Sequence, residues 1–401
     1  MLAVFAVVVA ACSVAPSPNP DEAAGGSADS PTTTAEQSPS STGPSLPAET
    51  VPSALRDGYD DPSFPDPLID PSQIMSGGPP PDGIPPIDKP LFVSTAQAGE
   101  WLKDAEPVVY VKIDGDVRAY PVQILIWHEI VNDVVGGVPI TVTYCPLCNS
   151  AVSYERTIDG EITTFGTSGR LFNSALVMYD RATETLWTHY DGRAVVGYLT
   201  GTHLTPIPSP LIAWSDFVAE FPDALVLDRE TTGFSRQYGA NPYGGYDNES
   251  ATPFLFRGDA DDRAALMRRV VGIVVGDDAV AWALDGLATG EASVMAGSVG
   301  DTDVVIFWKS GQSSALDANQ IGDGRDVGSV AVFQPIVDGR ELTFTAVGDR
   351  YEDLETGSEW TITGRAVAGE LEGSQLDQVH HLDTFWFAWS SYRPGTDLLG
   401  G

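Results

Sequence analysis

The residues best suited to chemistry lie in one stretch, Trp127 to Ser150. It holds His128, one of five histidines, and Cys145 and Cys148, two of three cysteines, which are spaced C-x-x-C. Two thiols and an imidazole can bind a metal ion, exchange between dithiol and disulfide, or cross-link the fold. The residue types by themselves leave these three roles open.

A helix and a strand must bring these side chains together. A helix is predicted from Pro121 to Val131, with His128 on its apolar face. After a turn at Gly136-Gly137, a strand from Pro139 to Tyr144 delivers Cys145 at its end. We therefore expect His128 to lie close to both sulfurs.

The chain after Cys148 has strand patterns and no helix pattern. A thioredoxin-type cysteine pair lies at a helix N-terminus, whose partial positive charge lowers the pKa of the thiol. Asn149, a residue that tolerates left-handed backbone, instead predicts a tight turn whose amides point at the sulfurs.

Short strands separated by turn residues predict a mainly β fold with few short helices. Val108 to Tyr120 is predicted to form a hairpin, and a second helix is expected near Leu211 to Glu220. Gly166 to Arg170 is interpreted as a plain hairpin loop. The alternating aromatics of Phe385 to Trp389 predict a strand that fills the core.

Two parts of the chain have similar sequences. Trp187 is followed by the sequence Gly-Arg-Ala-Val at residues 192–195, and Trp360 is followed by the same four residues at 364–367. We infer an internal duplication into two β-rich halves, residues 92–232 and residues 255–395, which predicts a body with pseudo-twofold symmetry.

The second half provides an internal comparison for the cysteine pair. Lys309 takes the place of Cys145, no thiol lies nearby, and the counterpart of the His128 helix, Leu284 to Glu291, has no histidine. If the pair only cross-linked the fold, the second half would be expected to need it too. A functional role for the pair is therefore favoured over a purely structural one.

The other histidines are further candidates. His189, His380 and His381 can each add a ligand to a metal site, whereas His203 lies in a turn that is typical of the surface. Structural zinc sites usually contain a second cysteine pair, which this chain lacks. A structural zinc site is therefore disfavoured.

The N-terminus predicts export. Leu2 to Ala11 is an apolar run too short to span a bilayer, and it ends in Val-Ala-Ala-Cys12, which resembles a bacterial lipobox although no Lys or Arg precedes it. The resemblance implies a signal peptide at residues 1–12 and a lipid on Cys12 that anchors the protein to the extracytoplasmic face of the bacterial cell membrane. A Pro/Ser/Thr-rich tether at residues 13–56 and an extended Pro-rich segment at residues 57–91 are predicted to follow.

Charge and missing motifs exclude other classes of function. The formal net charge of −35 repels phosphate backbones, so no nucleic-acid partner is expected. The sequence has no Rossmann fingerprint, Gly-x-Ser-x-Gly elbow or H-E-x-x-H motif. Dinucleotide-dependent and hydrolase functions therefore have no support.

Four motifs occur together: WHEIVND, TVTYCPLCNSAVSYER, FGTSGRLFNSALVMYDRATETLW and FWFAW. In these the chain resembles the bacterial family of unknown function DUF3179, some of whose members are described as selenoproteins. The resemblance implies redox or soft-metal chemistry at Cys145 and Cys148, with His128 matching the histidine of the family. This chain departs from the expected pattern after Trp187, where Thr188-His189 replaces a Ser-Gln-like pair.

Two classes of function follow. In the first, a thiol-dependent oxidoreductase, Cys145 and Cys148 exchange with a disulfide, and His128 acts as a base or lowers the pKa of a thiol. In the second, both thiolates and His128, with His189 or the pair His380-His381 as a further ligand, bind copper or zinc in a metal-binding or delivery protein without catalysis. Each class implies a protein partner, for redox or for metal exchange.

Overall fold

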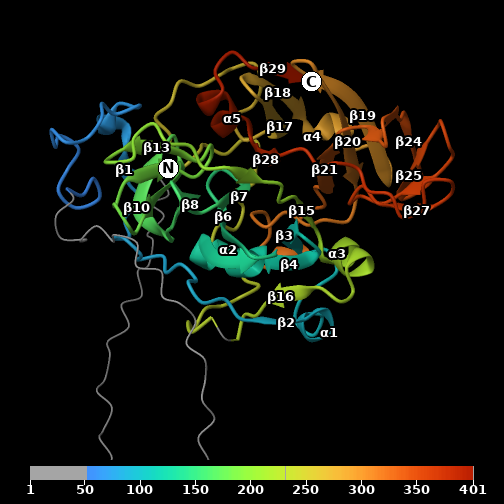
Figure 1. Cartoon of the computed structure of the whole chain (residues 1–401), viewed down its shortest axis with the longest axis horizontal. Helices are drawn as coiled ribbons and strands as arrows, with labels where there is room; N and C mark the ends of the chain where they lie inside the picture. The colour runs from blue at the N-terminus through green and yellow to red at the C-terminus, as the bar shows by residue number, and fades with distance from the viewer. Residues whose placement is uncertain (1–51, 231, 401) are drawn as a thin grey trace, which may run out of the picture. The chain divides into compact units, whose positions relative to one another are not determined.

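Short antiparallel strands dominate the computed structural model, which describes residues 52–230 and 232–400 (Figure 1). In this part of the chain the α-helices are four to seven residues long. The predicted mainly β fold is confirmed. None of the described helices has the length and apolar character needed to cross a bilayer. The signal peptide, Cys12 and most of the predicted tether lie outside the described residues.

The sheet that positions the cysteines has the strand order β14-β7-β6-β5. Its strands are β5 (Ile130–Val135), β6 (Val138–Cys145), β7 (Ser150–Glu155) and β14 (Pro206–Ile207). Valine and threonine recur along β5 and β6, and such β-branched residues favour strands. Gly136 and Gly137 make the turn between these two strands with positive φ, as predicted.

Two larger sheets and one two-stranded pair complete the first half, drawn in cyan to yellow-green in Figure 1. One has the order β15-β3-β4-β16-β2 and comprises β2 (Phe92–Ser94), β3 (Pro107–Ile113), β4 (Asp116–Pro121), β15 (Leu211–Ala213) and β16 (Leu225–Leu227). The other has the order β1-β10-β11-β12-β13 and comprises β1 (Met75–Ser76), β10 (Phe165–Phe172), β11 (Ala175–Asp180), β12 (Leu186–Thr188) and β13 (Arg193–Val196). The hairpin predicted at Val108 to Tyr120 is confirmed as β3 and β4.

The second half, drawn in orange to red, contains four more sheets (Figure 1). Their strands are β17 (Arg269–Val275), β18 (Asp278–Ala283), β28 (His381–Phe385) and β29 (Asp397–Leu399); β19 (Ala292–Val299), β20 (Thr302–Lys309) and β21 (Ser329–Phe333); β22 (Ile336–Val337) and β23 (Arg340–Glu341); and β24 (Phe344–Val347), β25 (Arg350–Asp353), β26 (Glu359–Trp360) and β27 (Ala366–Ala368). The small pair β8 (Thr157–Ile158) and β9 (Glu161–Ile162) belongs to the first half.

The described helices are short and lie between strands. They are α1 (Thr95–Ala98), α2 (Val122–His128), α3 (Trp214–Glu220), α4 (Leu284–Leu287) and α5 (Trp386–Tyr392), with the 3-10 turns η1 (Pro71–Gln73) and η2 (Ile321–Asp323). The helix expected near Leu211 to Glu220 is confirmed as α3, preceded by strand β15.

Three local predictions are wrong. Helix α2 ends at His128 rather than at Val131, because residues 130–135 pair with β6 as β5, and this pairing overrides the helical spacing. Phe385 to Trp389 is largely helix α5, since its aromatics also satisfy helical packing. Gly166 to Arg170 is not a loop but part of β10, which carries a bulge between Thr167 and Arg170.

Two buried tryptophans have matching surroundings in the two halves. Trp187 Nε1 donates to Asp180 Oδ2 at 3.0 Å, and Trp360 Nε1 donates to Asp353 Oδ2 at 2.9 Å. Each aspartate also accepts from a threonine hydroxyl three residues further along the chain. These contacts agree with the alignment of the halves, while the duplication itself stays a prediction.

The Pro-rich residues 57–91 contain only η1 and β1 as regular elements. Ile87 is buried, with its N–H donating to Ile130 O and its carbonyl accepting from Asn132 N. Earlier in the segment, β1 pairs with β10. The segment therefore packs along the sheets of the first half and contributes to their core.

Candidate functional site

The two cysteines lie on a tight turn between β6 and β7. Cys145 pairs with Ser150, and the four residues between them close the hairpin. Asn149 has a left-handed φ of 48°, as predicted. A backbone hydrogen bond from Cys148 acts to lower the pKa of the Cys145 thiol, and one from Ser150 acts to lower the pKa of the Cys148 thiol. We call residues 145–150 the cysteine knuckle; its backbone amides stabilise negative charge on both sulfurs.

His189 completes a buried cluster with the two cysteines. One ligand atom from each of Cys145, Cys148 and His189 lies within 4.8 Å of the others. Cys148 Sγ is 3.6 Å from His189 Nε2. The relative exposures of the three residues are 1%, 0% and 0%. Both cysteines are free thiols in this structure, although they lie close together.

The hydrogen bonds around His189 favour one tautomer. Thr143 Oγ1 donates to Val152 O at 2.8 Å, so at 3.0 Å it accepts from the Nδ1–H of His189. The neutral ring then carries its lone pair on Nε2, which faces Ser150 Oγ at 2.9 Å and Cys148 Sγ. This tautomer is inferred from hydrogen-bond partners, and it presents a basic nitrogen to the sulfurs.

The two thiols differ in acidity. Burial raises the pKa of the Cys145 thiol, but a hydrogen bond from the Cys148 side chain, together with the hydrogen bond and positive charge of His189 when its ring is protonated on both nitrogens, outweighs burial and holds that pKa well below its usual range. The pKa of Cys148 lies well above its usual range, because burial and the negative charge of Cys145 both oppose a second thiolate. The cluster therefore holds one thiolate and one thiol.

His128 does not join the cluster, which corrects the expected geometry. Its Nδ1 lies 2.7 Å from Pro85 O and its Nε2 lies 2.7 Å from the hydroxyl of Tyr238, so both ring nitrogens have other partners. The chain reverses immediately after it, because Glu129 adopts a left-handed φ of 58° at the end of α2. The ring therefore remains on the side of Pro85 and Tyr238.

Glu129 is a residue of this site that the sequence analysis did not select. Its carbonyl accepts from Tyr144 N at 2.9 Å, next to Cys145. Burial, and then the negative charge of Cys145, raise the pKa of the Glu129 carboxyl well above its usual range. A glutamate within an otherwise apolar run, IWHEIV, was the available signal. Thr143 and Ser150 were also missed.

The remaining histidines lie elsewhere. His381 Nδ1 is 2.9 Å from Val379 O and Nε2 is 3.4 Å from Val330 O, so its ring binds backbone carbonyls. Burial lowers the pKa of its neighbour His380 to about 4. His203 is exposed. Of the histidine ligands considered from sequence, only His189 lies with the cysteines among the described residues.

The second half contributes a wall of the site. The carbonyl of Cys148 accepts from Thr384 Oγ1 at 2.7 Å and from Phe385 N at 3.2 Å, both on β28. A segment between the halves also reaches the knuckle, because the hydroxyl of Tyr246 donates to Leu147 O at 3.0 Å. The knuckle is thus fixed by three parts of the chain.

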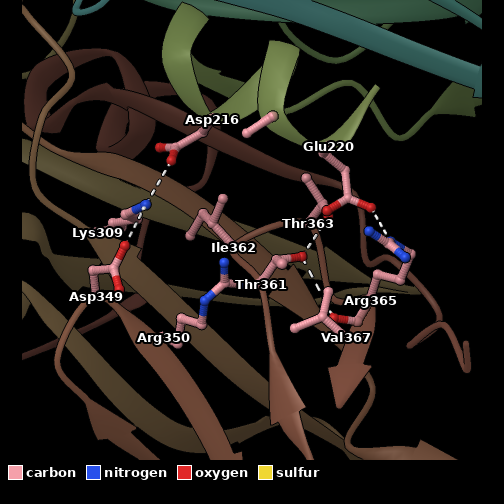
Figure 2. Close-up of a pocket in the computed structure, with 11 residues that line it drawn as sticks. Asp216, Glu220, Lys309, Asp349, Arg350, Thr361, Ile362, Thr363, Arg365 and Val367 are labelled. Atoms are coloured by element: carbon pink, nitrogen blue, oxygen red, sulfur yellow. Dashed lines mark hydrogen bonds and ion pairs between the residues drawn. The ribbon is translucent and has the colours of Figure 1, made fainter. Parts of the chain in front are cut away.

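Lys309 aligns with Cys145 when the sequences of the two halves are compared. It lies in a different environment from Cys145 (Figure 2). Its Nζ is 2.7 Å from Asp216 Oδ1 and 3.3 Å from Asp349 Oδ2. The same cavity, of about 100 Å³, is lined by a second ion pair between Glu220 and Arg365. At the position that the alignment relates to Cys145, the second half therefore has a lysine paired with two carboxylates.

Comparisons with known proteins give one result. No curated protein and no solved structure matches the chain. The sequence model of one family, described as "Protein of unknown function (DUF3179)", matches residues 81–396. This range includes the cysteine knuckle, His189 and the wall formed by β28. The chain therefore belongs to the DUF3179 family.

Proposed function

We propose that Cys145, Cys148 and His189 bind one soft or borderline metal ion, copper(I) or zinc(II), in a lipoprotein anchored through Cys12 on the extracytoplasmic face of the bacterial membrane. The main observation behind the metal site is that two sulfurs and one imidazole nitrogen, all from buried residues, lie within 4.8 Å of one another. Thiolate and imidazole are the donors that these ions prefer.

The separation between the donors supports this proposal. Zinc binds sulfur at about 2.3 Å and nitrogen at about 2.1 Å, so two such ligands at a tetrahedral angle lie about 3.6 Å apart. The distance between Cys148 Sγ and His189 Nε2 is 3.6 Å. The two ligands are already spaced for a shared ion, so little reorganisation is needed for binding.

The protonation of the donors also supports ligation. A metal ligand must be deprotonated, and the low pKa of Cys145 supplies one thiolate in advance. Thr143 holds the proton of His189 on Nδ1, which leaves Nε2 for the metal. The proton of Cys148 leaves when the ion enters, and the amide of Ser150 then stabilises the second thiolate.

Three protein ligands leave a fourth position of a tetrahedral ion open. A structural zinc site is usually closed by four protein ligands, whereas an open position lets an incoming ligand exchange. We therefore favour metal binding for delivery or exchange with a partner protein over a role in holding the fold together.

The experiment is to purify the chain under reducing conditions, load it with copper(I) or zinc(II), and measure metal content per chain. One ion per chain is expected for the wild type, and Cys145→Ser, Cys148→Ser and His189→Gln should each lose most of it. His203→Gln is the matched control, because His203 is exposed and outside the cluster. Metal content unaffected by all three cluster substitutions would reject the proposal.

A second function, thiol-disulfide redox chemistry, is favoured by one observation. The pKa of the Cys145 thiol is lowered and that of the Cys148 thiol is raised. This difference suits Cys145 as the attacking nucleophile and Cys148 as the cysteine that resolves the mixed disulfide. In this reaction the Cys145 thiolate attacks a disulfide of a partner, forms a mixed disulfide and releases one partner sulfur as a thiol; Cys148 then attacks Cys145 Sγ and releases the second partner sulfur as a thiol, so the partner is reduced and a Cys145–Cys148 disulfide forms. Counting free thiols at defined thiol-disulfide potentials distinguishes this function: a metal-free chain with a reversible Cys145–Cys148 disulfide supports it.

A further inference from the structure

The cysteine knuckle has almost no contact with solvent, although an ion or partner must reach it. Cys145 and Cys148 have relative exposures of 1% and 0%. Two tyrosines close to the knuckle, Tyr243 and Tyr246, come from the irregular chain between β16 and β17. We define residues 237–247 of that chain as the cover segment; it contains Tyr238, Tyr243 and Tyr246, all packed against the core that includes the cysteines.

The cover segment is bonded mainly to the second half. Asn241 N donates to Asn319 O at 2.9 Å, and Gly245 N donates to Asp317 O at 2.6 Å. At its end, the buried Asp247 forms ion pairs with the buried Arg269 and with the half-exposed Arg325. These contacts fix one side of the segment through the backbone and through charge.

Its contacts with the first half are of a different kind, because they pass through two tyrosine hydroxyls. Tyr238 OH lies 2.7 Å from His128 Nε2, and Tyr246 OH donates to Leu147 O at the centre of the knuckle. Tyr246 also reaches Ser174 of the first half. The hydroxyl of Tyr243, which lies between them in sequence, has no hydrogen-bond partner among the described residues.

Solvent already reaches the outer side of one of these contacts. Arg229, Glu230 and residues 233–238 line a hollow of about 480 Å³. The ring of Phe234 in this hollow is 40% exposed and lies 5.2 Å from the ring of His128, measured between centroids. The contact between Tyr238 and His128 therefore lies at the edge of this hollow, where α2 ends.

We propose that the cover segment is a gate to the thiol site, held shut by the hydroxyls of Tyr238 and Tyr246. This inference deepens the proposed function, on which it rests for the identity of the bound ion. It gives His128 a role as a hydrogen-bond partner of the gate rather than as a metal ligand. Breaking either contact raises the population in which the sulfurs are open to solvent. The aromatic rings and the bonds to the second half keep the segment in place when the gate is closed.

The test measures how fast N-ethylmaleimide modifies the metal-free, reduced full-length chain, with mass spectrometry of peptides to resolve Cys145 and Cys148 from Cys12. Tyr238→Phe and Tyr246→Phe should each speed modification of the knuckle cysteines about fivefold, the factor that corresponds to about 1 kcal/mol for one hydrogen bond. Tyr243→Phe is the matched control, with the rate of the wild type expected. Thermal unfolding of every variant shows whether the fold persists.

Knuckle cysteines that react at the wild-type rate in both Tyr238→Phe and Tyr246→Phe would overturn the gate. So would an equal acceleration in Tyr243→Phe, because that result indicates general loosening of the segment. Neither outcome depends on metal, so a chain that binds no ion can still have the gate, and a chain that binds one can lack it. Metal content therefore tests the proposed function separately.

Discussion

Replacing Thr143 by valine should weaken metal binding without removing any ligand. Thr143 Oγ1 accepts from His189 Nδ1 at 3.0 Å, and valine has nearly the same shape but no acceptor. In the metal-bound state Nε2 is occupied, so the proton must remain on Nδ1, which then faces an apolar side chain. In the metal-free state the proton can move to Nε2 and bond to Ser150 Oγ. The cost therefore falls on the bound state.

The magnitude follows from the lost bond. A buried N–H without a partner costs about 1–3 kcal/mol, which raises the dissociation constant about five- to 150-fold. Loss of a residue that orients a metal-bound histidine typically costs about 10- to 100-fold. We therefore expect Thr143→Val to raise the dissociation constant for zinc by one to two orders of magnitude, measured by competition with a chromophoric chelator.

Thr141→Val is the control on the same strand. Thr141 is fully buried, and its hydroxyl has no hydrogen-bond partner in the described part of the chain, so valine removes an unsatisfied polar atom. We expect an unchanged dissociation constant and an equal or higher melting temperature. A Thr143→Val variant that binds zinc as tightly as Thr141→Val would refute the argument from the tautomer.

Three further predictions concern stability. The pKa of Glu129 is raised in the folded state, so the stability that the neutral carboxyl contributes is present at low pH and is lost as pH rises. Glu129→Gln should therefore raise the melting temperature more at pH 8 than at pH 4. The pKa of His380 is lowered to about 4, so folding loses stability as pH falls from about 6.5 towards 4, and His380→Gln should reduce that loss in urea titrations at each pH. Trp360→Phe removes the donor to Asp353 and should lower the free energy of unfolding by about 2 kcal/mol while leaving metal content per chain unchanged, since Trp360 lies outside the cluster.

Local features of the knuckle could be predicted from sequence because they depend on neighbouring residues. Asn149 favours left-handed backbone, and Gly136-Gly137 supplies the turn that lets β5 and β6 pair, whatever packs around them. The position of His128 could not be predicted in this way. It depends on where α2 ends, and strand pairing from Ile130 onward ended the helix earlier than its apolar spacing indicated.

The sequence named His189 as a further candidate ligand, but which histidine joins the two cysteines depends on the tertiary structure. His189 lies 41 residues beyond Cys148 and follows β12, so only the packing of two sheets against each other brings its ring to the knuckle. Its sequence neighbours gave a departure from the family pattern rather than a ligand motif. Glu129 was hidden for a similar reason, because its burial beside Cys145 depends on the left-handed residue that ends α2.

The bonds from Thr384 and Phe385 to the carbonyl of Cys148 mean that the two halves cannot be treated as separate modules. A fragment cut before β17 would keep both cysteines and His189 yet lose both donors to that carbonyl. Its thiol chemistry would then depend on adding the missing fragment back in trans. Substitutions near the end of the chain, far from any cysteine in sequence, would therefore change the environment of Cys148.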